Sequence, residues 1–281
     1  MTFSLRVIET ARSHLPSYWI YYLIGGLGWE EISYSALLAQ SDTATVLIGG
    51  DFPPDDSPIS DIWLELGETY AGAEGREKMR LHRSPQNLVD QLARLGVQPE
   101  DVTHVVITPL ISYTAGTLDL FPDAELLIGE QGWLEFMLPD RCPDDPRPRR
   151  YHREPLPREC VVPRDQLHYL LDHWDRVRIL DDTGDEVVDG LTTWRAGAHH
   201  RSSLAVRIPT DEGAVIWSDA AFHNANVVDD VPIGVVEDLR ECRDSYARIR
   251  RESDLFLAAS DPGHLRRYPD GVVTISQETA G

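Results

Sequence analysis

The 281-residue chain has little cysteine. Its three cysteines, Cys142, Cys160 and Cys242, are far apart, and no two of them have the spacing of a metal-binding pair. Disulfide-stabilised secreted domains and zinc modules built on paired cysteines need more thiols than this. The scarcity of cysteine excludes both classes and predicts a reduced, cytoplasmic setting.

Basic side chains are also scarce. Lysine and arginine together number 26, against 47 aspartates and glutamates, which gives a formal net charge of -21. Because nucleic-acid binders use lysine and arginine to displace counterions, this balance excludes a nucleic-acid partner. The excess of acid is typical of a solvated, acidic surface.

Long hydrophobic runs are missing as well. The stretch 18–24, Tyr-Trp-Ile-Tyr-Tyr-Leu-Ile, is apolar, but a helix needs about 20 residues to cross a bilayer. The first residues, Met-Thr-Phe-Ser-Leu-Arg, do not resemble a signal peptide. The sequence therefore predicts no membrane segment. Hydrophobic residues still make up 42% of the chain, so we expect residues 1–281 to fold as a single domain around a buried core.

The order of apolar and polar residues predicts alternating strands and helices. Five segments have the apolar, β-branched composition of buried strands: 44–48, 102–108, 204–208, 214–218 and 255–259. Two segments have helical spacing of apolar residues: 84–96 and 237–251. The turn residues 209–213 predict a hairpin between the third and fourth strands.

A segment rich in proline and arginine interrupts this order. Repeated prolines at 139–165 predict a long inserted loop, because proline lacks the amide hydrogen that regular structure needs. The loop contains a basic cluster, Arg147, Arg149, Arg150 and Arg153. The arginines could contact an anionic substrate. Alternatively, the loop is a plain surface loop without a binding role.

The segment that begins at residue 102 contains several residues of a known motif. It reads Val-Thr-His-Val-Val-Ile-Thr-Pro-Leu-Ile-Ser-Tyr-Thr-Ala-Gly and continues to Phe-Pro-Asp-Ala at 121–124. This resembles the metallo-β-lactamase superfamily, in which Thr-His-x-His-x-Asp-His-Ala-Gly precedes Phe-Pro-Asn/Asp-Ala. The resemblance runs from about residue 40 to 275 and is closest to the lactonase-like branch. It implies an α/β fold, a four-layer αβ/βα sandwich.

The metal-binding positions of that motif are altered here. Pro109, Ile111, Tyr113 and Thr114 stand where the superfamily has its histidines and aspartate. Proline and isoleucine side chains have no lone pair for a metal, and threonine is a poor substitute for imidazole. The resemblance therefore implies a fold without the usual zinc pair, and we expect neither metal nor cofactor.

The second half of the chain continues the resemblance. Gly-Ala-His-His-Arg-Ser-Ser at 197–203 is similar to the superfamily's Gly-x-His-Thr-Pro-Gly-Ser, which puts His199 at a ligand histidine. Asp219 matches the bridging aspartate, and Ser260 stands in place of the last histidine. Because neighbours on a strand point to opposite faces, His200 is not expected to face the same way as His199.

The resemblance brings several polar side chains to one edge of the sheets. An aspartate–histidine pair can act as a general base, and a tyrosine can donate a hydrogen bond to an oxyanion. The candidate catalytic residues are His199, Asp219, Tyr113 and Ser260. The candidate substrate-binding residues are Thr114, His200, His223 and Asp261. A purely structural role, with His199 and Asp219 paired in a vacated site filled by Tyr113, is the alternative.

Three functions are compatible with this pattern. The favoured one is a metal-independent enzyme that uses acid/base chemistry on a small carbonyl compound, by hydrolysis, cyclisation or rearrangement of an ester, lactone or thioester. The second is a non-catalytic protein that binds a ligand or a protein partner. The third is a metal-dependent, lactonase-like hydrolase with replacement ligands among His200, His223, Asp261 and His264. The expected partner is a small-molecule substrate, and a homodimer is also compatible with the sandwich.

Overall fold

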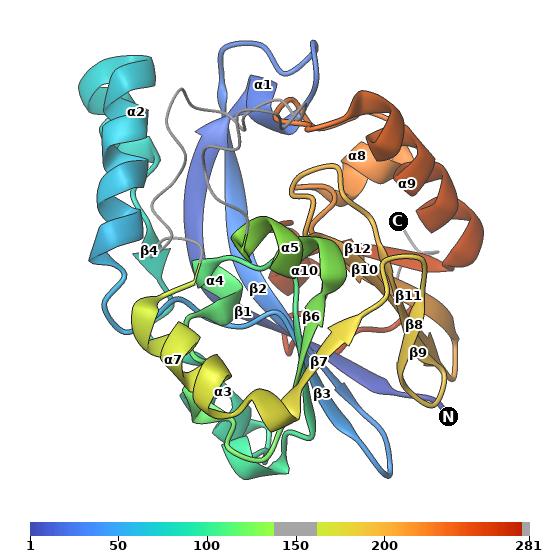
Figure 1. Cartoon of the computed structure of the whole chain (residues 1–281). Helices are drawn as coiled ribbons and strands as arrows, with labels where there is room; N and C mark the ends of the chain where they lie inside the picture. The colour runs from blue at the N-terminus through green and yellow to red at the C-terminus, as the bar shows by residue number, and fades with distance from the viewer. Residues whose placement is uncertain (138–161, 277–281) are drawn as a thin grey trace.

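Two β-sheets face each other in this protein (Figure 1), whose computed structural model describes residues 1–137 and 162–276. The first sheet has the strand order β4-β1-β2-β3-β5-β6-β7, and the second has the order β12-β11-β10-β9-β8. The first contains β1 (Ser4–Pro16), β2 (Trp29–Gln40), β3 (Thr45–Ile48), β4 (His82–Arg83), β5 (His104–Ile107), β6 (Glu125–Gly129) and β7 (Val177–Leu180). The second contains β8 (Asp185–Val188), β9 (Leu191–Arg195), β10 (Leu204–Thr210), β11 (Gly213–Ser218) and β12 (Leu255–Ala258).

Helices cover the outer side of each sheet. The α-helices are α1 (Ser17–Ile20), α2 (Ser57–Lys78), α3 (Leu88–Arg94), α4 (Ser112–Ala115), α5 (Glu130–Met137), α7 (Arg164–Asp172), α8 (Asn224–Val228), α9 (Leu239–Glu252) and α10 (His264–Arg267). In Figure 1, α2, α3 and α7 lie on one side of the molecule, and α8 and α9 lie on the other. None of these helices is long and apolar enough to cross a membrane, within the residues that the structure describes.

The hydrophobic core is divided by the sheets. Successive residues of β6 illustrate this, because Leu127 points between the two sheets whereas Leu126 points outward. The cluster between the sheets combines Leu127 with Trp217 of β11, and the outer cluster combines Leu126 with Leu92 of α3 and Leu170 of α7. A third cluster joins the outer face of the second sheet to α9. The four-layer αβ/βα sandwich is confirmed.

The predicted elements are confirmed with shifted ends. The hairpin of β10 and β11 turns at residues 211–212, and α9 starts after Asp238, whose carboxylate accepts from the Arg240 and Glu241 amides. The helix expected from residue 84 begins only at Leu88, where the Asn87 side chain caps it by accepting from the Asp90 amide over 2.9 Å. Of the predicted loop at 139–165, residues 139–161, which include the four arginines, lie outside the described residues, and Arg164 already begins α7.

Parallel strand pairing determines where a site can form. Strands β3, β5, β6 and β7 pair in parallel in the first sheet, as β11 and β12 do in the second. Ligand sites of open α/β sheets lie beyond the carboxyl ends of such strands. Here the loops that leave β5, β9 and β11 meet at this edge. Two hydrogen bonds join them: the Leu204 amide donates to Thr108 Oγ1 over 2.7 Å, and the Leu110 amide donates to Ser202 Oγ over 3.2 Å.

Candidate functional site

A buried carboxylate lies at the centre of this edge. Asp219 follows β11 directly and is 3% exposed. Its Oδ2 lies 2.8 Å from His199 Nδ1, and its Oδ1 accepts a hydrogen bond of 2.6 Å from the Ser203 hydroxyl. The Tyr113 hydroxyl donates to Oδ2 over 3.4 Å. Side chains from the loops after β5 and β9 therefore converge on the carboxylate that follows β11.

His200 belongs to the same cluster, and the expectation that it faces away from His199 is wrong. The two imidazole rings have centroids 4.0 Å apart, and His200 Nε2 lies 3.4 Å from the Tyr113 hydroxyl oxygen. Both histidines lie in the turns between β9 and β10, where Ala198 has a φ of 63°. The alternation of side chains along a strand does not apply to such a backbone.

Aromatic rings surround the cluster. Phe222 packs on His199 with ring centroids 4.5 Å apart, and Tyr113 packs on Tyr34 and Phe52 at 5.2 and 6.0 Å. Tyr34 is buried, and burial raises the pKa of its phenol well above the ordinary value. Charged groups interact more strongly in such surroundings, because the effective dielectric constant is lower than that of water.

Thr114 and Ser260 make hydrogen bonds that involve backbone groups. Thr114 is buried, and its hydroxyl donates to the carbonyl oxygens of Pro109 and Ile111 within its own turn. Ser260 is half-buried, and its carbonyl oxygen accepts from the Ser33 amide over 2.9 Å, which joins the loop after β12 to β2. These bonds hold backbone together. A role in substrate binding or catalysis for either residue stays a prediction.

His223 and Asp261 make hydrogen bonds outside the Asp219 cluster. His223 Nε2 donates to the carbonyl oxygen of Glu31 over 2.9 Å, and its Nδ1 lies 2.8 Å from the Tyr21 hydroxyl. The Asp261 carboxylate accepts from the Asn224 and Gly263 amides at 2.8 and 2.7 Å. His223 thus connects the loop after β11 with β2 and with the segment after α1, and Asp261 connects the loop after β12 with the start of α8.

His264, the last of the four candidate replacement ligands, is 2% exposed. Its Nε2 donates to the Ala258 carbonyl oxygen over 2.7 Å, and burial lowers the pKa of its imidazole. A neutral, buried histidine of this kind stabilises the end of β12.

Sequence reasoning missed Ser203 and Phe222. Ser203 stood in the quoted motif but had no assigned role, and a buried serine directly before a strand is the signal that could have revealed it. Asp51 is another buried carboxylate to which the sequence pattern assigned no role. Asp51 is 2% exposed and is bound by Arg83, whose Nη2 lies 2.8 Å from its Oδ1. Burial raises the pKa of the Asp51 carboxyl, and the charge of Arg83 opposes that rise.

One group of side chains among the described residues could hold a metal ion. One ligand atom each from His199, His200 and Asp219 lie within 4.8 Å of one another. A catalytic zinc ion needs three protein ligands, so a pair of ions needs about six. Pro109 and Ile111 offer no donor, and the Thr114 hydroxyl donates to the carbonyl oxygens of those two residues. The donors present therefore do not fit two zinc ions.

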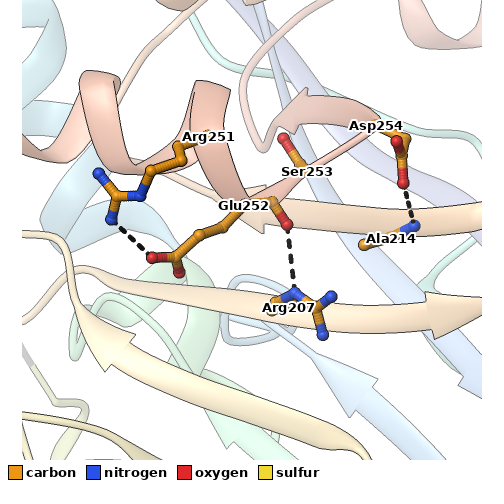
Figure 2. Close-up of a pocket in the computed structure, with 6 residues that line it drawn as sticks. All are labelled: Arg207, Ala214, Arg251, Glu252, Ser253 and Asp254. Atoms are coloured by element: carbon orange, nitrogen blue, oxygen red, sulfur yellow. Dashed lines mark hydrogen bonds and ion pairs between the residues drawn. The ribbon is translucent and has the colours of Figure 1, made fainter.

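A surface hollow of about 420 Å³ lies elsewhere in the molecule (Figure 2). It is bordered by Ala214 and Asp254, at the starts of β11 and β12, so it lies at the sheet edge opposite Asp219. Figure 2 shows that its charges are paired: Arg251 donates to the Glu252 carboxylate over 2.7 Å, and Arg207 Nε donates to the Glu252 carbonyl over 3.1 Å. The Asp219 cluster, not this hollow, has the chemistry of a reactive site.

Comparison with known proteins connects this geometry to a family, although no family model matches the chain. The chain is 27% identical over 202 residues to the N-acyl homoserine lactonase AiiB of Agrobacterium fabrum. That match covers 70% of this chain and 66% of the relative, so it spans just under two thirds of the relative's length. Two solved structures, a quorum-quenching N-acyl homoserine lactone lactonase and an N-acyl homoserine lactone hydrolase, have TM-scores of 0.67 and 0.68 with 17% and 16% identity.

The fold likeness extends over nearly the whole chain. The two structures cover 94% and 95% of this protein, and 95% and 96% of their own chains. The chain therefore has the metallo-β-lactamase fold of these structures, and its sequence is similar to that of a lactonase. In this fold, the cluster around Asp219 occupies the edge at which the resemblance places the superfamily's metal-binding motifs.

Proposed function

We propose that this protein is a hydrolase of the lactonase branch that opens a small lactone, or a related ester, by acid/base chemistry without a zinc pair. The observation that carries the proposal is the 2.8 Å contact between His199 Nδ1 and the buried carboxylate of Asp219. A carboxylate in this position orients the imidazole and stabilises its protonated form. The names of the relatives make N-acyl homoserine lactones the first substrates to test.

The proposed reaction uses His199 as the general base. Its Nδ1 donates to Asp219, and its Nε2 accepts a proton from water as the water oxygen bonds to the lactone carbonyl carbon. The electron pair of the C=O bond moves to the carbonyl oxygen, and the Tyr113 hydroxyl turns from its long, 3.4 Å hydrogen bond with Asp219 to donate to that oxygen. When the ring C–O bond breaks, the proton passes to the leaving alkoxide, and the product is a hydroxy acid.

The distances within the cluster favour a proton-transfer pair over shared ligation. Two ligand atoms of one tetrahedral zinc ion lie roughly 3.3 Å apart, since each bond is about 2.0 Å long. His199 Nδ1 and Asp219 Oδ2 lie 2.8 Å apart, which is the length of a charge-assisted hydrogen bond. The distance therefore corresponds to a direct hydrogen bond between these two atoms.

A single metal ion is the second candidate, and the grouping of His199, His200 and Asp219 favours it. Elemental analysis separates the two candidates, on protein purified without chelator and again after incubation with zinc, manganese and iron. We expect less than one tenth of an ion per chain (roughly) to remain after dialysis, because the donor set meets only the minimum for one catalytic ion. One tightly held ion per chain that is lost in His200→Ala would establish the metal-dependent alternative.

Turnover of a panel of lactones, esters and thioesters tests the catalytic roles. We expect His199→Ala and Asp219→Asn each to lower kcat/KM about a hundredfold or more, because general-base catalysis contributes about 10²–10⁴ in rate. His104→Gln is the matched control, since His104 is another half-buried histidine but lies at the start of β5. Full activity in Asp219→Asn would contradict the proposal. Binding of panel compounds without any turnover would instead support the non-catalytic function.

A further inference from the structure

We infer that Ser203 is a positioning residue that fixes the orientation of the Asp219 carboxylate toward His199. The inference rests on the proposed acid/base function of this pair. Ser203 is fully buried, with 0% of its surface exposed, so its hydroxyl bonds to protein groups instead of bulk water. Its hydroxyl contacts Asp219, and it acts on the acid/base pair through that carboxylate.

The hydroxyl of Ser203 makes two hydrogen bonds whose directions are determined. Its oxygen accepts from the His200 backbone amide over 3.2 Å, and an amide can only donate. Its single hydrogen is therefore directed to Asp219 Oδ1, 2.6 Å away. Because a hydroxyl has only one hydrogen, Ser203 donates to the carboxylate and cannot donate to another group at the same time.

The backbone of Ser203 fixes the turn that carries the histidines. Its amide donates to the His200 carbonyl oxygen over 2.9 Å. Its carbonyl oxygen accepts from the amides of Ala196 and Gly197 over 2.8 and 3.1 Å. One residue thus holds both partners of the acid/base pair: the carboxylate through its side chain, and the histidine turn through its main chain.

The two carboxylate oxygens of Asp219 therefore have different hydrogen-bond partners. Ser203 occupies Oδ1, so Oδ2 is the oxygen that meets His199 Nδ1 over 2.8 Å and the Tyr113 hydroxyl over 3.4 Å. Without the Ser203 hydroxyl, the buried Oδ1 atom loses its hydrogen-bond donor. The carboxylate can then rotate so that its two oxygens accept hydrogen bonds from His199 and from water. A general base depends on an orientation that such a rotation would disturb.

Three variants test this inference. We expect Ser203→Ala to lower kcat about a hundredfold with little change in KM, which is the size of effect that a misplaced catalytic group produces. Ser203→Thr keeps a hydroxyl and should recover most of that loss. Ser245→Ala is the matched control, because the buried Ser245 hydroxyl also makes a 2.6 Å hydrogen bond to this loop, to the Ala196 carbonyl, and does not contact Asp219.

A spectroscopic readout makes the test independent of turnover. In the wild-type protein, NMR should detect the His199 Nδ1 hydrogen as a resonance shielded from solvent exchange by Asp219. We expect this resonance to survive in Ser245→Ala and Ser203→Thr, and to be lost or to exchange faster in Ser203→Ala.

The two readouts distinguish failure of the inference from failure of the proposed function. If Ser203→Ala keeps both the resonance and the wild-type kcat, the positioning role is overturned, whatever reaction the protein catalyses. If the wild-type protein hydrolyses no compound of the panel but the resonance still depends on Ser203, the positioning role holds and the proposed function fails. A Ser203→Ala protein with an altered unfolding midpoint but an unchanged resonance also overturns the inference, because its effect would be purely structural.

Discussion

Asp51 and Asp219 are almost completely buried, at 2% and 3% exposure, and the protein stabilises their charges by different means. Asp51 accepts from the guanidinium of Arg83 and from the amide of Phe52, so a permanent cation neutralises it. Asp219 is bound by a serine, a tyrosine and a histidine, and none of these is a permanent cation. This contrast assigns a structural role to Asp51 and leaves Asp219 able to take part in proton transfer.

Removal of Arg83 should therefore destabilise the fold strongly. Arg83→Met leaves the Asp51 carboxylate buried without its cation, and we expect the free energy of unfolding to fall by about 3 kcal/mol. Arg80→Met is the control, because Arg80 forms a solvent-exposed pair with Glu77 that is worth less than about 1 kcal/mol. Urea unfolding at neutral pH measures both. Equal, small losses in the two variants would show that Asp51 does not depend on Arg83.

At the scale of elements, the position of α4 depends on the turn that follows β3. A methyl group on Gly50 would lie 2.3 Å from the carbonyl oxygen of Thr114, so the turn and α4 can touch only because residue 50 lacks a side chain. Tyr113 lies in α4, next to this contact. The contact between the turn after β3 and α4 thus sets the position of the Tyr113 phenol relative to Asp219.

Gly50→Ala should displace α4. We expect a loss of about 2 kcal/mol in unfolding free energy from overpacking, together with lower activity, since Tyr113 moves with its helix. In Gly26→Ala, no atom lies within 4 Å of the added methyl, so this control carries only the strain of a φ of +65°. Thermal unfolding and turnover of both variants check the expectation. A Gly50→Ala protein as stable and active as Gly26→Ala would contradict it.

The elements also show where sequence patterns succeed and fail. The short parallel strands were predictable because they are continuous apolar runs. The long antiparallel β1 was not, because a register shift between Glu9 and Ala11 breaks its alternation and because Thr10 and Ser13 are buried. Ser84 was expected to begin a helix, but its amide instead donates to the Thr10 carbonyl oxygen over 2.7 Å beside β4.

Across the whole molecule, the convergence of Tyr113, His199 and Asp219 was predictable from the order of the motifs. The inclusion of His200 was not, because it depends on the positive φ of Ala198 in a turn with no strong sequence signal. The contacts of His223 and Asp261 also depend on the packing of loops from distant parts of the chain. The single domain, the cytoplasmic setting and the homodimer stay predictions.

One buried and two half-buried histidines should make the stability of the molecule depend on pH. Burial lowers the pKa of His14, His104 and His264 below the ordinary value of 6.5. The unfolded chain therefore binds more protons than the folded protein just below pH 6.5, and the free energy of unfolding falls as the pH drops from 7.5 to 5.5. Each histidine contributes at most about 1.4 kcal/mol per pH unit.

His264→Gln isolates the largest contribution, because His264 is the most buried of the three and glutamine can still donate to the Ala258 carbonyl oxygen. Guanidinium unfolding at pH 7.5 and pH 5.5 should show a smaller loss of stability in this variant than in the wild type. An identical loss in both proteins would mean that His264 is protonated in the folded state.

The first strand also has a consequence for the order in which the protein can be assembled on the ribosome. The Val7 amide donates to the Gly271 carbonyl oxygen, the Val273 amide donates to the Leu5 carbonyl oxygen, and the Phe3 amide donates to the Pro209 carbonyl oxygen. These partners lie more than 200 residues after residues 3–7 in the sequence. During translation, the edge of residues 3–7 that meets them therefore stays unpaired until they have been synthesised, and an unpaired strand edge is a place where nascent chains can associate.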